Sequence, residues 1–273
     1  MDACNKNLLD TIDGHTSFVR RRILELAHKS GKNGSHTGGS LSLVEILCTL
    51  YSTIESSSSN DESRDRVILS KGHGALALYC TLERFGILLS EQTATFESNG
   101  THFFAHASRD VKNGIEFSGG SLSLGISYAV GVALSSKSKL LGNHIYVIVG
   151  DGECDEGLVW ESAMSMANFH LDNVTVVVDK NGLQSDGYTS EVMDTSSLKD
   201  KFAAFGFNSI EVDGHSVEQL VAAFTEPNNA KPKAIIANTI KGKGISFMEN
   251  QTNWHHGIVD DAIFMNALNE LNK

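Results

Sequence analysis

The sequence predicts an α/β fold in which a mostly parallel β-sheet is covered by helices on both faces. Short, continuously apolar segments, such as HIYVIVG (144–150) and VTVVVD (174–179), alternate with longer segments of helical periodicity. This alternation is typical of buried parallel strands connected by helices. The chain has 273 residues and two prolines, at positions 227 and 232, so most of its helical segments contain no helix breaker.

The individual elements follow from local patterns, in chain order. Apolar side chains recur near helical spacing over residues 8–30, which predicts a long amphipathic helix. The serine-rich residues 55–65 are expected to form a loop before the first apolar strand. The predicted helices are 8–30, 41–51, 75–85, 121–134 (rich in small residues), 157–169 and 216–224. The predicted strands are 67–70, 144–150, 174–179, 208–212 and 233–240.

Composition narrows the class of protein. The net charge of −11 argues against a nucleic-acid-binding surface, which needs a basic footprint. The four cysteines are scattered without a C-x-x-C pair, which fits a reduced compartment better than a disulfide framework or a zinc ribbon. The N-terminal segment lacks a signal-peptide pattern and no apolar run reaches membrane-spanning length. We therefore expect a cytoplasmic protein that binds neither nucleic acid nor membrane.

The segment VIVGDGECDEGLVW (147–160) raises a question about charge. An apolar strand runs directly into Gly150-Asp151-Gly152 and then into the start of a helix. The free N–H groups at a helix start favour an anion such as phosphate. The same turn carries four acidic residues, which would repel phosphate. A divalent cation held between the acidic side chains and the phosphate resolves this conflict.

Asn181 supplies the second half of this predicted site. It lies thirty positions after Asp151 and also follows a predicted strand, so both residues belong to the same edge of a parallel sheet, where ligands gather. An Asp carboxylate, an Asn carbonyl and a nearby backbone carbonyl form a set of hard oxygens suited to Mg²⁺. The segment DKNGLQSDG (179–187) does not match a calcium loop, because its sixth position is Gln184 rather than glycine and no glutamate closes it.

Longer motifs resemble the transketolase family. GDGE followed about thirty residues later by Asn is the thiamin diphosphate fingerprint. The further motifs are SHTGGSLSLVEIL (35–47), SKGHGALALYCTLERFG (70–86), GIEFSGGSLSLGISYAVGVAL (114–134), GDGECDEGLVWESAMSMA (150–167) and KGKGISFMENQTNWHHG (241–257). The resemblance covers nearly the whole chain, whereas a full transketolase is far longer. It therefore implies the N-terminal subunit of a split, two-chain transketolase, with residues 1–273 as a single thiamin diphosphate-binding (PP) domain.

The resemblance implies an enzyme that transfers a two-carbon ketol unit from a ketose or ketose phosphate to an aldose or aldose phosphate. The implied cofactors are thiamin diphosphate and Mg²⁺, with Ca²⁺ or Mn²⁺ able to substitute. In this family the glutamate that activates the cofactor belongs to a pyrimidine-binding domain, which this chain is expected to lack. We therefore expect the chain to be inactive alone and to need a C-terminal transketolase subunit carrying that domain, in an α₂β₂ heterotetramer.

The resemblance also assigns roles to individual residues. The implied metal ligands are Asp151, Asn181 and the backbone carbonyl of Leu183. The implied cofactor contacts come from His73, Gly120, Leu122, Gly152, Glu153 and His255. The implied catalytic residues are His36 and His106, which face sugar hydroxyls and help to move protons, and Glu156, which couples paired active sites across the dimer.

Some assignments stay open at the level of sequence. His256 competes with His255 for the cofactor, because it directly precedes the glycine of NWHHG. Lys241 and Lys243 could touch phosphate, although solvated loop lysines are the expected interpretation. The family patterns H-P-G and G-Q-G are replaced here by His-Thr-Gly and by Ser-Leu-Gly (123–125), and the second change puts partner contacts or substrate range in doubt.

Two other functions stay compatible with a thiamin diphosphate site. One is the alpha subunit of a 2-oxo acid dehydrogenase, which also carries a diphosphate site on a separate chain. The histidines at positions 36, 73 and 106, in transketolase-like settings, favour a sugar donor over this alternative. The other is a non-catalytic protein that retains the fold, and the presence of Asp151, Asn181 and the histidines argues against it.

Overall fold

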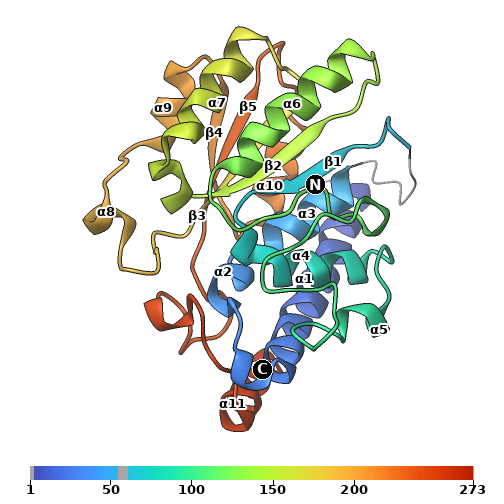
Figure 1. Cartoon of the computed structure of the whole chain (residues 1–273), viewed down its shortest axis with the longest axis vertical. Helices are drawn as coiled ribbons and strands as arrows, with labels where there is room; N and C mark the ends of the chain where they lie inside the picture. Colours follow the sequence, from blue (N-terminus) through green and yellow to red (C-terminus); the bar gives the residue numbers. More distant parts are fainter. Residues whose placement is uncertain (1–2, 55–60, 273) are drawn as a thin grey trace.

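A five-stranded parallel sheet lies in the middle of the protein, with the strand order β1-β2-β3-β5-β4 (Figure 1). The strands are β1 (Arg66–Leu69), β2 (Ile145–Gly150), β3 (Val174–Lys180), β4 (Asn208–Asp213) and β5 (Lys233–Asn238). The computed structural model describes residues 3–54 and 61–272, so residues 55–60 of the expected loop lie outside the described residues. Each pair of neighbouring strands in this sheet is parallel, which confirms the predicted fold class.

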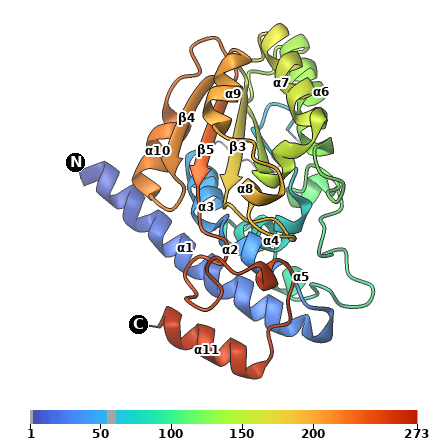
Figure 2. The ribbon, with the colours of Figure 1, turned by 90° about the vertical axis from the view of Figure 1, so that its left-hand side faces the viewer.

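Helices cover both faces of the sheet (Figure 2). The core on one face includes α1 (Ala3–Lys29), α3 (Val44–Thr53), α4 (Ala75–Arg84) and α10 (Val217–Thr225), and the core on the other includes α6 (Leu124–Ser138), α7 (Gly157–Asn168) and α9 (Leu198–Ala204). Within β3, Val177 joins the first core whereas Val176 and Val178 join the second, as the alternation of side chains along a strand requires. The other described α-helices are α2 (Thr37–Leu41), α5 (Ser90–Thr93), α8 (Thr189–Val192) and α11 (Asp261–Leu271).

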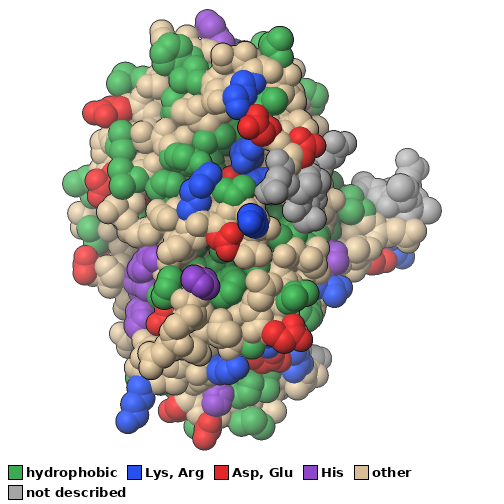
Figure 3. Space-filling model, turned by 45° about the vertical axis from the view of Figure 1, so that its right-hand side comes forward, with side chains coloured by type: hydrophobic (Ala, Val, Ile, Leu, Met, Phe, Trp, Pro, Cys, Tyr) green, Lys and Arg blue, Asp and Glu red, His purple; other side chains and the backbone are tan. Residues whose placement is uncertain are grey.

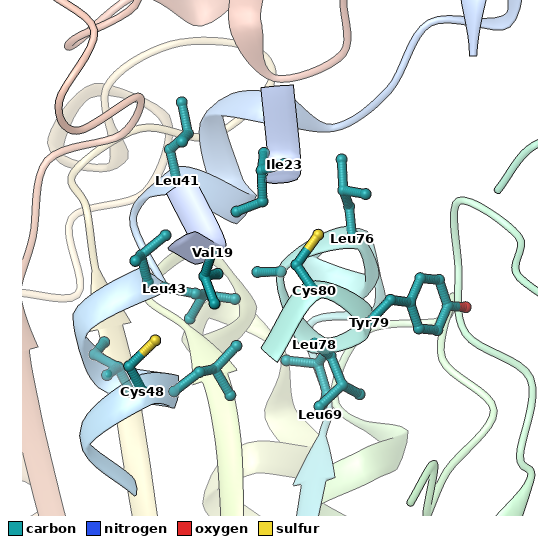
Figure 4. Packing of buried hydrophobic residues seen from close by; sticks show 14 of the residues in the cluster. Val19, Ile23, Leu41, Leu43, Cys48, Leu69, Leu76, Leu78, Tyr79 and Cys80 are labelled. Carbon is teal, nitrogen blue, oxygen red and sulfur yellow. The ribbon is translucent and has the colours of Figure 1, made fainter. Parts of the chain in front are cut away.

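The larger core joins α1 and α4 to the edge of the sheet. Figure 4 shows Val19 and Ile23 of α1 beside Leu76 and Cys80 of α4, with Leu69 of β1 nearby. A four-residue spacing places Val19 and Ile23 on the same side of α1, so both side chains are buried together. Burial of one such side chain contributes about 1.5–3 kcal/mol. This packing fixes the positions of the loops that leave β1 and enter α4.

The structure corrects several predicted boundaries. The helix predicted over 121–134 begins only at Leu124, because Ser123 adopts a left-handed backbone conformation with φ of 68°. The helix predicted over 41–51 is divided between α2 and α3. Helices α9 and α11 were not predicted, although Asp260 caps α11 by accepting the N–H of Ile263. Across the described ranges, no helix combines the length and apolar character needed to cross a membrane.

Candidate active site

A cavity of about 250 Å³ opens at the carboxyl ends of β1, β2 and β3. Every site residue predicted from the sequence lines this cavity, with the exception of Glu156. The cavity is also lined by Lys71, Gly150, Gln184 and Ser185, which sequence reasoning did not select. Glu156 instead lies at the N-cap of α7, where it is exposed, so its proposed role between paired active sites stays a prediction.

The three predicted metal ligands come together along one wall. Asp151 ends β2, and its Oδ2 accepts the N–H of Gly182 at 2.7 Å and the hydroxyl of Thr189 at 3.2 Å. Burial and the nearby charge of Asp179 raise the pKa of the Asp151 carboxyl, so an added cation would stabilise its ionised form. The side-chain oxygen of Asn181 and the carbonyl of Leu183 complete a set of hard oxygen donors. This donor set fits Mg²⁺ or Ca²⁺ rather than a soft metal.

A buried carboxylate orients Asn181. Asp179 Oδ2 accepts the side-chain N–H of Asn181 at 3.2 Å, which identifies the other amide atom, Oδ1, as the oxygen that faces away from Asp179. The same carboxylate is paired with the ammonium group of Lys71 and accepts the hydroxyls of Ser42 and Thr239. Burial alone would raise the pKa of Asp179, but the charge of Lys71 and these hydrogen bonds outweigh it and hold the pKa below its usual value.

Lys71 is a site residue that the sequence analysis missed. Its side chain is 0% exposed and lines the cavity, yet it lies between a strand and the KGHG turn, where a lysine is ordinarily solvated. The available signal was the pairing of this lysine with Asp179, since both directly follow or end apolar strands at the same sheet edge. Two positions of this kind in a parallel sheet lie close together.

Glu153 connects three loops around the cavity. Its carboxylate accepts the N–H of Ser123 at 2.7 Å, the N–H of Gly150 at 3.0 Å and the hydroxyl of Ser70. Burial raises the pKa of this carboxyl in spite of the three donors. The side chain is therefore fully engaged with the protein, and the prediction that Glu153 contacts the cofactor concerns its backbone N–H. The neighbouring glycines permit close packing, because a Cβ on Gly72 would lie 2.7 Å from the backbone of the 119–120 loop.

Histidine rings surround His36 at the cavity mouth. The centroid of its ring lies 4.7 Å from His256, 5.1 Å from His106, 5.6 Å from His255 and 5.9 Å from His73. Burial, followed by the positive charge of these neighbours, lowers the pKa of His36 to about 3. The imidazole is therefore neutral near physiological pH, and a neutral ring both donates and accepts hydrogen bonds. Its Nδ1 is buried without a hydrogen-bond partner, which leaves it available to a bound ligand.

The two adjacent histidines of NWHHG have different surroundings. His255 lines the cavity, and burial together with the charge of Lys241 lowers its pKa to about 4. His256 is exposed and packs against His36 outside the cavity lining. This placement favours His255 as the residue that faces a cofactor. Figure 3 shows exposed histidine side chains gathered on the left-hand part of one face, while Lys and Arg side chains are interspersed with Asp and Glu.

The expectation that Lys241 is a solvated loop lysine is wrong. Its side chain is 1% exposed, and its ammonium group donates to the carbonyl of Leu183 and to Nδ1 of His255, each at 2.9 Å. Burial, followed by repulsion from Lys71, lowers the pKa of Lys241 to about 8. Lys243 is closer to the expectation, since it is partly exposed and pairs with Glu249 at 3.7 Å. Two buried lysines therefore lie beside one cavity, an arrangement that suits a polyanionic ligand.

Comparisons with known proteins agree with this geometry. The family model described as "Transketolase, thiamine diphosphate binding domain" matches residues 15–265. One of the two subunits of the apulose-4-phosphate transketolase from Phocaeicola vulgatus is 35% identical, with 97% of this chain and 95% of that protein covered. The 6-deoxy-6-sulfo-D-fructose transketolase subunit SqwG of a Clostridium species is 40% identical, with 94% of each chain covered.

Solved transketolases share the fold over a larger chain. The transketolase of Campylobacter jejuni superposes with a TM-score of 0.85 at 25% identity, over 100% of this chain and 43% of that one. The transketolase of Leishmania mexicana superposes with a TM-score of 0.86 at 24% identity, over 96% of this chain and 41% of that one. The chain thus spans about two fifths of the length of these solved proteins.

Proposed function

The chain belongs to the transketolase family, in the part that binds thiamin diphosphate, and on that premise we propose that it is the N-terminal subunit of a split, two-chain transketolase. The proposed reaction transfers a two-carbon ketol unit from a ketose or its phosphate to an aldose or its phosphate. The observation that carries the proposal is one cavity that combines three hard oxygen donors, neutral histidines and buried lysines. Two relatives of nearly equal length are themselves named as transketolase subunits, which supports it.

We propose that the wall formed by Asp151, Asn181 and the Leu183 carbonyl holds Mg²⁺. The N–H of Gly152 and the ammonium group of Lys241 are then the protein groups suited to the diphosphate, because both are hydrogen-bond donors beside these oxygens. When bound, thiamin diphosphate supplies a nucleophilic carbon and an electron sink for breaking a bond next to a carbonyl. Ca²⁺ or Mn²⁺ would fit the same oxygen donors.

The histidines are the groups of this chain suited to handle sugar hydroxyls. His36 is neutral and has an unpaired buried Nδ1, so it can accept a proton from a hydroxyl group that enters the cavity. His106 packs against this ring and lines the same cavity. We assign His36 and His106 to proton movement and to orientation of the sugar, and His73 and His255 to the cofactor.

The proposal includes a second protein chain that completes the site. This partner would be a C-terminal transketolase subunit carrying the pyrimidine-binding domain, in an α₂β₂ assembly, with residues 1–273 as one PP domain. The relatives that this chain covers almost completely are named as subunits, which supports a two-chain enzyme. Leu124, at the start of α6, is 48% exposed beside the cavity-lining Leu122, and an apolar surface at that position suits a protein contact.

Purification of the complex from its native host tests this function. We expect a second chain in equal amount, with bound thiamin diphosphate and Mg²⁺, and ketol transfer with xylulose 5-phosphate but no decarboxylation of pyruvate. The variant Asp151→Asn should lose the cofactor and the metal, whereas Asp172→Asn, at an exposed ion pair, should retain both. Activity with pyruvate would instead indicate a 2-oxo acid dehydrogenase. A complex that binds no thiamin diphosphate would contradict any catalytic function of this type.

A further inference from the structure

The loop that carries Lys241 is held by residues that lie outside the cavity. It connects β5 to the KGKG segment and runs through residues 239–244. We propose that His215, in the DGHS segment between β4 and α10, is a positioning residue that places the ammonium group of Lys241 beside the diphosphate site. This inference rests on the proposed function, because it concerns how the chain holds the cofactor's diphosphate.

His215 contacts the backbone directly before Lys241. Its Nε2 accepts the N–H of Ile240 at 2.8 Å, and its Nδ1 lies 2.9 Å from the carboxylate of Glu45 on α3. These two contacts assign the proton to Nδ1, since Nε2 must remain free to accept. Glu45 is 8% exposed, so the imidazole is held by a buried acceptor rather than by solvent. The ring therefore fixes one backbone amide of the loop relative to α3.

The other side of the loop is held through the same carboxylate. Arg20 of α1 pairs with Glu45 and donates from its Nε to the carbonyl of Lys243 at 3.1 Å. A Cβ on Gly244 would lie 2.6 Å from this guanidinium, which shows how closely the loop approaches Arg20. Backbone contacts thus restrain the residue before Lys241 and the second residue after it, and both restraints meet at Glu45.

Fixing the backbone matters because the Lys241 side chain reaches the cavity from behind its lining. The ammonium group donates to the Leu183 carbonyl and to His255, both of which line the cavity. A long flexible side chain has many rotamers, and a displaced backbone would point the ammonium group elsewhere. The loss of the His215 contact to Ile240 should therefore weaken anion binding through Lys241.

Magnesium pyrophosphate is a suitable probe, measured on the full chain by isothermal titration calorimetry. In His215→Asn the shorter amide occupies the position of Nδ1, so the Glu45 contact is retained and the Ile240 contact is lost. In His215→Gln the amide reaches the position of Nε2 and can accept the Ile240 N–H. We expect about tenfold weaker binding for the Asn variant, and recovery to within about threefold of wild type for the Gln variant. In a Lys241→Met background, the Asn substitution should cause no further loss.

Each other outcome overturns the inference. Unchanged affinity in His215→Asn would mean that His215 does not position Lys241. An equal loss in the Lys241→Met background would mean that His215 acts on the fold as a whole. If His215→Asn does not fold, as judged by circular dichroism, Glu45→Gln replaces it, and wild-type affinity in that variant would count against the inference. Failure of the wild-type chain to bind magnesium pyrophosphate would be a different result, since it would remove the proposed function as well.

Discussion

Replacement of Lys71 by Met should destabilise the chain by leaving a charge stranded in its interior. Lys71 and Asp179 are both 0% exposed and form an ion pair beneath the cavity. Methionine fills a similar volume without the ammonium group, so the Asp179 carboxylate would stay buried without its counter-ion. Breaking a buried pair from one side costs about 3–5 kcal/mol.

The hydrogen bonds that remain place the expected cost at the lower end of that range. Ser42, Thr239 and Asn181 would still donate to the Asp179 carboxylate. We therefore expect a loss of about 3 kcal/mol in the free energy of unfolding, because these donors continue to solvate the charge. For a chain of this size the corresponding decrease in Tm is roughly 6–12 °C.

The assay is thermal unfolding followed by circular dichroism, with two comparison variants. Lys233→Met is the matched control, because Lys233 is equally buried but donates only to the backbone carbonyls of Ala223 and Glu226, so no carboxylate is stranded. The double variant Lys71→Met/Asp179→Asn should recover at least half of the lost Tm, since it contains no unpaired charge. A Tm decrease below about 2 °C for Lys71→Met, or no recovery in the double variant, would refute this reasoning.

Acidification gives a second measurement with a definite sign. In the wild-type protein the pKa of Asp179 is held below its usual value, so its contribution to stability is present above the unfolded pKa and is lost as pH falls through the folded pKa. In Lys71→Met the same carboxyl should have a raised folded pKa, so protonation should relieve its buried charge. The Tm difference between the two proteins should therefore shrink as pH falls from 7 towards 4.

Two further predictions concern the cavity and its surroundings. Gly125→Ala should destabilise the fold by several kcal/mol, because the new methyl would lie 2.6 Å from the backbone and side chain of Ser70; Gly131→Ala in the same helix faces open space and should be neutral or stabilising by up to about 1 kcal/mol, and equal Tm values for the two variants would contradict this. The ring protons of His36 and His255 should show no titration between pH 8 and 5 in NMR spectra, because their pKa values are lowered to about 3 and about 4. Since these folded pKa values lie below the unfolded value near 6.5, both histidines should reduce stability as pH falls below 6.5, and a midpoint near 6.5 for either ring would show that it is solvated.

Most of the metal-site arrangement could be predicted from local sequence patterns. Asp151 and Asn181 each follow an apolar strand, and a parallel sheet necessarily brings the ends of neighbouring strands to one edge. The fold class followed from the same alternation of strands and helices. The grouping of the predicted histidines around the cavity relied on the family resemblance, because no sequence spacing relates position 36 to position 255.

The buried lysines could not be predicted in this way. Whether a lysine in a glycine-rich loop is solvated depends on the partner that the folded chain brings to it. Lys71 is buried because Asp179, more than one hundred positions later, supplies a counter-charge. Lys241 is buried because Leu183 and His255 offer acceptors from two other segments. These partners are set by tertiary structure, which local propensity does not encode.

The cavity is assembled from segments that extend from His36 to His255, and this has a consequence for how ligand occupancy and folding are related. Any partial unfolding that releases one of these segments would also open the binding site. A bound ligand should therefore oppose local opening in almost every part of the chain, and free energy of binding should appear as global stability. For one site the added stability is about 2.7 kcal/mol when the free ligand is at one hundred times its Kd. The melting temperature of the chain should thus report the supply of its cofactor, and hydrogen exchange should slow well beyond the residues that touch it.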